Sequence, residues 1–173
     1  MIENNKEEFL LRVDPDKLEE KRFKICSADD RDYGKLEFPK WSERDTTVMT
    51  SFGNFRLLGN NRWNIGIRVL KNDLEIAEMS MRGANSHIHI LLTGGLEIVL
   101  KRRMFSSEFK NEDFNLTIRT ERDNIPSTLF SVNKKWRIII PSKSIVDKDL
   151  LLCLIAIFIS YAYKLLGGLE IPG

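Results

Sequence analysis

The chain has 173 residues, of which 42% are hydrophobic and 30% are charged, and its formal net charge is +2. This length can supply one domain with a sizeable core, and the composition excludes the disordered and fibrous classes of protein. Residues 47–147 carry 15 basic and 10 acidic groups, an excess too small for a nucleic-acid-binding surface, so we expect no nucleic acid partner.

The first 46 residues contain three short segments of strand-like composition, at residues 9–13, 22–26 and 35–38. Asp14 and Pro15 open a possible helical turn that would run to Glu20. The chain starts with acidic and polar residues instead of the basic and then apolar pattern of a secretory signal. Cys26 and Cys153 are too far apart to indicate a disulfide framework. We therefore expect a cytoplasmic protein with reduced thiols.

Residues 47–140 form a succession of short segments with alternating or β-rich composition, separated by Gly, Asn and Asp turn signals. The breaks are short enough to join neighbouring strands as antiparallel hairpins, which predicts a meander. The expected strands are residues 47–52, 55–58, 63–70, 74–82, 87–92, 96–102, 114–120, 128–133 and 135–140.

Alternation within these strands predicts which side faces inward. Trp63, Ile65, Ile67 and Val69 share one face of their strand. The segments 96–100, 114–118 and 136–140 repeat this alternation. Each strand is therefore expected to have one buried face and one polar face.

The last hydrophobic segment, residues 150–166 (LLLCLIAIFISYAYKLL), is apolar on every side. Ser144 and Asp147 have the spacing of a capping box, and Asp147 and Asp149 place negative charge where a helix would begin. Gly167 and Gly168 would end it. We therefore predict a helix over residues 147–166.

A helix without a polar face must be enclosed by lipid, by a partner or by the strands of its own chain. Its 17 residues would span about 25 Å, near the lower limit for crossing a bilayer core of about 30 Å. About 10–12 antiparallel strands can instead close around a central helix, which also removes exposed sheet edges. The favoured fold is a mainly β, single-domain antiparallel barrel of residues 1–173 around this helix, and a membrane anchor or an oligomer contact are the alternatives.

Two segments resemble the tubby-like fold, which is shared by tubby C-terminal domains, phospholipid scramblases and LURP-one-related proteins. Residues 138–163 (IIIPSKSIVDKDLLLCLIAIFISYAY) are similar to the end of scramblases and LURP-one-related proteins, where a strand and a turn lead into the buried helix. Residues 62–82 (RWNIGIRVLKNDLEIAEMSMR) are similar to a hairpin of that family. The resemblance implies the barrel with a central helix and a non-enzymatic binding function.

The chain also departs from these families. Scramblases have an Asp-rich, calcium-associated segment before the helix, whereas residues 130–140 contain no carboxylate, so calcium binding is not carried over. Tubby domains bind phosphoinositide head groups through basic residues of the barrel wall. None of those basic residues aligns with a particular Lys or Arg of this chain, so no site residue is transferred from the family.

The densest basic clusters are the candidate ligand-binding residues. Such clusters recognise phosphate groups through charge-assisted hydrogen bonds, although solvated strand ends have the same composition. The candidates for binding a phosphate or a lipid head group are Lys101, Arg102, Arg103, Lys134, Lys135 and Arg137.

Other residues give weaker signals for function. His87 and His89 lie on one side of an expected strand, but no third metal ligand is evident nearby. The two Gly pairs, Gly94–Gly95 and Gly167–Gly168, do not precede a helix in the order that a phosphate-binding loop requires. We therefore expect no catalytic residue, metal or cofactor.

These observations favour a non-enzymatic tubby-like binding domain in the cytoplasm that associates with anionic phospholipid or phosphoinositide head groups at a membrane surface, or with a protein partner. The alternative is a scramblase-type protein whose C-terminal helix is inserted in the membrane as an anchor.

Overall fold

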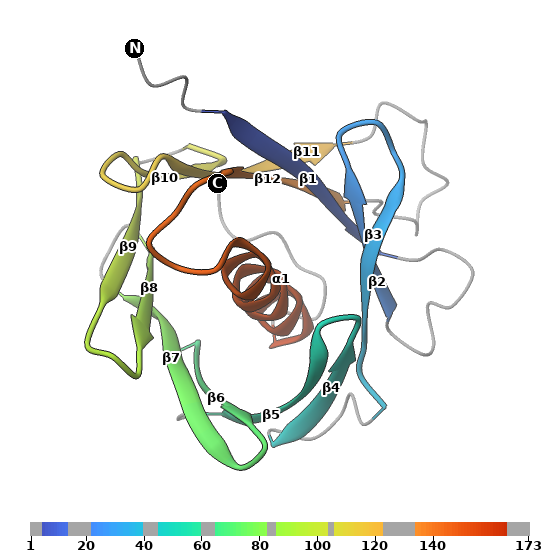
Figure 1. The fold of residues 1–173 in the computed structure, drawn as a ribbon, viewed down its shortest axis with the longest axis vertical. Helices are drawn as coiled ribbons and strands as arrows, with labels where there is room; N and C mark the ends of the chain where they lie inside the picture. Colours follow the sequence, from blue (N-terminus) through green and yellow to red (C-terminus); the bar gives the residue numbers. More distant parts are fainter. Residues whose placement is uncertain are drawn as a thin grey trace.

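Twelve strands among the described residues form one closed antiparallel barrel in the computed structural model (Figure 1). The structure describes residues 5–13, 22–39, 45–59, 65–82, 86–103, 106–122 and 134–165. Strands that follow each other in sequence are neighbours, and β1 pairs with β12 to close the ring. The strands are β1 (Lys6–Val13), β2 (Arg22–Ser27), β3 (Asp32–Glu37), β4 (Thr46–Thr50), β5 (Gly53–Gly59), β6 (Gly66–Lys71), β7 (Leu74–Arg82), β8 (His87–Leu92), β9 (Glu97–Arg102), β10 (Glu108–Asn111), β11 (Leu116–Arg122) and β12 (Lys134–Pro141).

The barrel confirms the fold expected from the sequence, including the three N-terminal strands. The strand β10 was not predicted from the sequence, because its four residues contain one apolar side chain, Phe109, and show no alternation. The expected strand at 128–133 and the expected turn at 14–20 lie outside the described residues.

Alternate side chains of each strand point into the barrel and form its core. Ile67 and Val69 of β6 are fully buried, as the alternation predicted. The same holds for Ile98 and Leu100 of β9. Trp136 of β12 is also buried. The polar residues between them face outward, so the outer wall carries most of the charge of the barrel.

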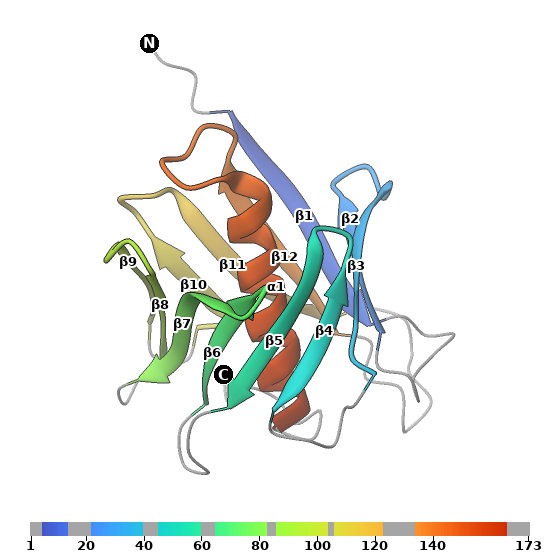
Figure 2. The same ribbon diagram turned by 60° about the horizontal axis from the view of Figure 1, so that its bottom comes forward.

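The helix α1 (Lys148–Leu165) follows β12 and runs down the middle of the barrel (Figures 1 and 2). The Asp147 carboxylate accepts a hydrogen bond of 2.8 Å from the Leu150 amide, which makes Asp147 the N-cap. The capping box expected from Ser144 is therefore wrong, because the Ser144 hydroxyl accepts from the Val146 amide before the helix begins.

Every side chain of α1 from residue 151 to residue 162 is buried. The only polar side chains in this stretch are Ser160, which donates to the Ala156 carbonyl at 2.7 Å, and Tyr161. The strands thus enclose the apolar helix on all sides, in agreement with the sequence expectation. Within the described residues, no helix combines the length and hydrophobicity of a membrane span.

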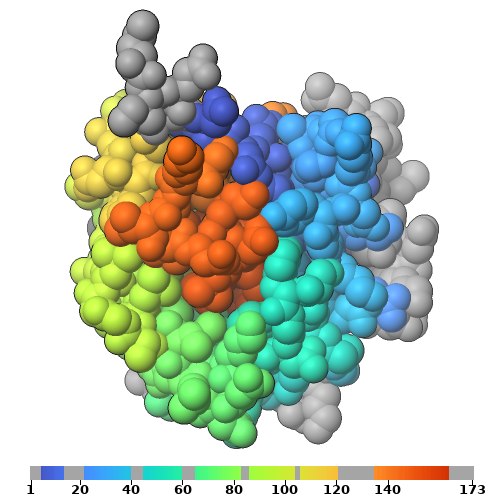
Figure 3. Space-filling view, in the orientation of Figure 1, coloured from blue at the N-terminus to red at the C-terminus, as the bar shows by residue number. Residues whose placement is uncertain are grey.

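The connection from β12 to α1 covers one end of the barrel (Figure 3). Val146 turns inward and is buried, whereas Ile145 is 76% exposed. Ser142 fixes the connection to the start of β1, because both its amide and its hydroxyl donate to the Asn5 carbonyl, at 2.8 and 2.7 Å. The helix is therefore held at its entry as well as along its length.

Candidate functional site

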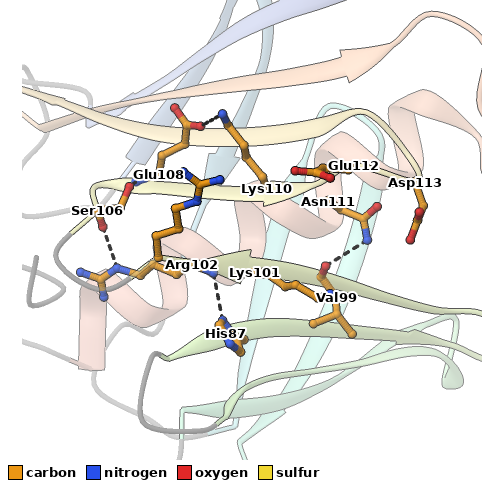
Figure 4. Close-up of a pocket in the computed structure, with 11 residues that line it drawn as sticks. His87, Val99, Lys101, Arg102, Ser106, Glu108, Lys110, Asn111, Glu112 and Asp113 are labelled. Atoms are coloured by element: carbon orange, nitrogen blue, oxygen red, sulfur yellow. Dashed lines mark hydrogen bonds and ion pairs between the residues drawn. The ribbon is translucent and has the colours of Figure 1, made fainter.

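A groove of about 660 Å³ follows the outer wall of the barrel over β8, β9 and β10 (Figure 4). Its volume lies within the range of small-molecule sites. The lining is rich in charge on both sides, with Lys101, Arg103 and Lys110 among its basic residues and Glu108, Glu112 and Asp113 as its acidic residues.

The groove lies where two neighbouring strands share a short ladder. β9 and β10 pair at only two positions, Phe109 with Arg102 and Lys110 with Lys101. Beyond them the Asn111 side chain takes over from the backbone, donating to the Val99 carbonyl at 2.9 Å and accepting from the Phe114 amide at 2.8 Å. The strands therefore separate without leaving this carbonyl unsatisfied, and the space between them opens to the outside.

Lys101 and Lys110 stand directly opposite each other across β9 and β10. Both side chains are exposed and point away from the core. Like charges in this position repel each other. Lys110 forms an ion pair with Glu108. Among the described residues, neither Lys101 nor Arg103 has an ion-pair partner, so two cations of the groove are uncompensated.

Arg102 has a different position from its two basic neighbours. It is 8% exposed, and its guanidinium lies 5.5 Å from the centre of the Phe109 ring. Its Nε donates to the Ser106 carbonyl at 2.8 Å. Arg102 thereby connects the end of β9 to Ser106, while Lys101 and Arg103 remain at the surface.

The two histidines lie on the same side of β8, as expected, and that side is the outer one, but each has its own partner. His87 Nδ1 accepts a hydrogen bond of 2.9 Å from the Arg102 amide, which places the proton of the neutral ring on Nε2. His89 Nδ1 lies 2.9 Å from the Glu97 carboxylate. Within the described part of the chain, no group of three or more His, Cys, Asp and Glu residues could hold a metal ion.

The second basic cluster lies two strands away from the groove, on β12. Arg137 forms an ion pair with Glu8 of β1 and stands opposite Arg119 of β11. Lys135 is half-buried on the same outer face. The backbone of Lys134 belongs to β12, and its side chain lies outside the described residues. The structure thus leaves Lys101 and Arg103 exposed, buries Arg102 between them in sequence, and separates all three from the cluster on β12.

A row of basic residues that the sequence did not reveal crosses the wall next to this cluster. Arg12 and Lys35 of the row have acidic neighbours, with 3.2 Å from Arg12 to Asp30 and 3.2 Å from Lys35 to Glu37. The row consists of directly opposed residues on four adjacent strands: Lys135 of β12, Arg12 of β1, Lys24 of β2 and Lys35 of β3.

Comparison of the chain with models of known protein families, with curated proteins and with solved structures finds no match.

Proposed function

We propose that this barrel is a non-enzymatic, tubby-like binding domain that holds the phosphate group of an anionic phospholipid in the groove over β9 and β10. The membrane contact is peripheral, through the outer wall. One observation carries the proposal: Lys101 and Lys110 are held directly opposite each other at the surface, beside Arg103.

The arrangement of these cations favours an anionic ligand. Two opposed lysines destabilise the free barrel slightly, and an anion between them removes that repulsion. Lys101 and Arg103, without ion-pair partners among the described residues, give a ligand full access to their charge. Charge-assisted hydrogen bonds from such groups to phosphate oxygens are stronger than neutral ones.

Neutral donors of the groove complete the same recognition. Because His87 Nδ1 accepts the Arg102 amide, its Nε2–H is left to donate. The Ser106 hydroxyl oxygen accepts from the Glu108 amide at 3.1 Å, so its proton is likewise available for donation. A tetrahedral phosphate offers several acceptor oxygens to such a set.

The row of Lys135, Arg12, Lys24 and Lys35 supports a contact between the wall and a negatively charged bilayer. A basic residue close to an anionic surface contributes about 1 kcal/mol. The ion pairs of Arg12 and Lys35 reduce this contribution. The row begins two strands from β10 and runs round the barrel away from the groove, so a flat bilayer at the groove meets only the near end of the row, and the groove supplies the specific contact.

The buried helix favours this peripheral contact over an inserted anchor. Insertion of α1 would expose the inner faces of the strands, because each of its side chains from 151 to 162 packs inside the barrel.

The hydrogen bond of His87 favours a binding role over a catalytic one. Its Nδ1 lone pair already accepts from the Arg102 amide, so this nitrogen is not available to take a proton from a substrate.

Sedimentation with vesicles tests the proposal. Vesicles of phosphatidylcholine containing phosphatidylglycerol should bind the protein, and vesicles of phosphatidylcholine alone should not. The double variant Lys101→Glu, Arg103→Glu should lower binding at least about tenfold, because reversal of two charges removes and then repels the phosphate contact.

The double variant Arg56→Glu, Arg68→Glu is the matched control, since both residues are exposed on β5 and β6, away from the groove, and their reversal changes the net charge by the same amount. It should retain most of the binding. Equal losses of binding in the control and in the groove variant would mean that binding depends on the overall charge of the protein and not on the groove. Absence of binding by the unchanged protein would refute the lipid function.

A further inference from the structure

The charges of the groove are separated along its length. Lys101 and Lys110 lie at its middle, and Glu112 and Asp113 lie at the end where β10 turns into β11 (Figure 4). Lys110 and Glu112 are two residues apart in sequence, so their Cα atoms are separated by at most about 7 Å. A ligand with a positive and a negative group close together would meet complementary charge at both ends.

Among the described residues, no Lys or Arg side chain forms an ion pair with the carboxylates at the acidic end of the groove. Glu108 is shared between Lys110 and Arg119, so its charge is already compensated. Glu112 and Asp113 are exposed, and among the described residues neither side chain forms an ion pair or a hydrogen bond. The groove therefore presents uncompensated cations and uncompensated carboxylates to one ligand.

Local backbone structure keeps the two carboxylates beside the basic centre. The Asn111 side chain accepts from the Phe114 amide and so closes the turn that carries both acidic residues. Asn115 continues this turn in the left-handed region, with a φ of 52°, which Asn tolerates better than most residues. Asn111 also holds β9 through the Val99 carbonyl, so the acidic turn is attached to the strand of Lys101.

We propose that the groove selects phosphate esters that also carry an ammonium group, such as the head groups of phosphatidylserine and phosphatidylethanolamine or their soluble phosphoamine counterparts. This inference rests on the proposed phosphate-binding function and adds the identity of the head group. Lys101, Lys110 and Arg103 take the phosphate, and Glu112 and Asp113 take the ammonium group. In an ethanolamine ester only two carbon atoms separate the ester oxygen from the nitrogen, so both charged groups of one ligand can lie within the same groove.

Vesicles of equal charge separate this selectivity from general attraction. Phosphatidylserine and phosphatidylglycerol each carry one net negative charge, so bulk electrostatics predicts equal binding. The groove should instead favour phosphatidylserine about fivefold, in line with two partly exposed ion pairs. The double variant Glu112→Gln, Asp113→Asn should lose this preference while its binding to phosphatidylglycerol stays equal or increases, because only negative charge has been removed.

The double variant Asp73→Asn, Glu75→Gln is the matched control, because both acidic residues are exposed at the turn between β6 and β7 and at the start of β7, outside the groove, and it removes the same amount of charge. It should keep the preference. Equal binding of the two vesicle types by the unchanged protein, with sensitivity to Lys101→Glu, would overturn the inference and leave the phosphate-binding function standing.

Calorimetry with soluble probes distinguishes a lipid from a free metabolite. Phosphoethanolamine should bind more tightly than glycerol phosphate, although it carries less negative charge, which is the reverse of the order that bulk electrostatics predicts. Binding of phosphoethanolamine without binding to any vesicle would support the selectivity and refute the membrane function. Tighter binding of glycerol phosphate would refute the selectivity, and failure of all probes and vesicles would refute both.

Discussion

The phenol of Tyr33 donates a hydrogen bond to the carboxylate of Asp149, which joins β3 to the first turn of the central helix. The residue next to Asp149 reinforces this connection. Lys148 Nζ lies 2.6 Å from the Glu7 carboxylate of β1 and 5.8 Å from the centres of the Phe9 and Tyr33 rings. The entry of the helix is therefore fixed to two strands of the barrel by polar contacts as well as by packing.

Tyr33→Phe should lower the free energy of unfolding by about 1 to 2 kcal/mol, because a part-buried carboxylate loses its donor. Urea denaturation followed by circular dichroism measures this change. Tyr163→Phe is the matched control, since Tyr163 forms no hydrogen bond among the described residues, and it should change stability by less than about 0.5 kcal/mol. Equal effects in both variants would contradict a specific role of the Asp149 contact.

Leu154→Ala should test whether the helix is the core of the barrel. Leu154 is fully buried at the middle of α1, so its truncation should lower the free energy of unfolding by about 2 to 5 kcal/mol. Leu74→Ala, at a side chain that is 71% exposed, is the control and should have little effect. A small change for Leu154→Ala would mean that the strands do not enclose the helix.

Both thiols should be unreactive in the native protein. Cys26 is 1% exposed and Cys153 is fully buried, and burial raises the pKa of both. A chromogenic disulfide reagent should therefore modify neither thiol until denaturant is added, and then both, because the thiolate is the reactive form. Rapid modification of Cys153 in the folded protein would show that the helix leaves the barrel.

Alkaline pH should destabilise the barrel through ionisation of the Cys153 thiol. Burial raises the pKa of Cys153 from 9.0 to about 11. The folded state thus favours the neutral thiol, and its contribution to stability is complete below the unfolded pKa and is lost as the pH rises toward the folded one. Between about pH 8 and about pH 10.5, Cys153→Ala should lose about 2 kcal/mol less stability than the unchanged protein. If the free energy of unfolding depends on pH in the same way for both proteins, the Cys153 thiol is not buried in the folded state.

Reversal of one groove lysine should move stability and binding in opposite directions. Lys101→Glu replaces a repulsive cross-strand pair with an attractive one, so the free protein should gain about 0.5 kcal/mol of stability. The same variant should bind anionic vesicles less tightly. Thermal unfolding without ligand, together with vesicle sedimentation, measures both effects, and a loss of stability would show that Lys101 contributes to the fold.

Part of the groove could be identified from the sequence. Lys101, Arg102 and Arg103 are adjacent in sequence, and their charge alone marks them as candidates. Strict alternation along β9 would also have separated Lys101 from Arg102, since Leu100 is buried and every second residue shares its side. The alternation alone therefore indicates that Lys101 faces outward and Arg102 faces inward.

The remaining residues of the groove could not be identified in this way. Lys110 is nine positions from Lys101, and only the pairing of β9 with β10 places the two face to face. The strand that carries Lys110 has too few apolar residues to be recognised. The basic row across β12, β1, β2 and β3 likewise depends on three separate strand registers.

The alternation of apolar residues predicts strands with one apolar face and a helix with no polar face, and together these favour a barrel that encloses the helix. Hydrophobic burial depends on the period of apolar residues, and this period can be read without knowing which strands are neighbours. Which charged side chains lie next to each other depends on how the strands pair in the folded barrel. Strand register, the short ladder between β9 and β10 and the Asn111 bridge bring distant residues together, and none of these follows from the local sequence pattern.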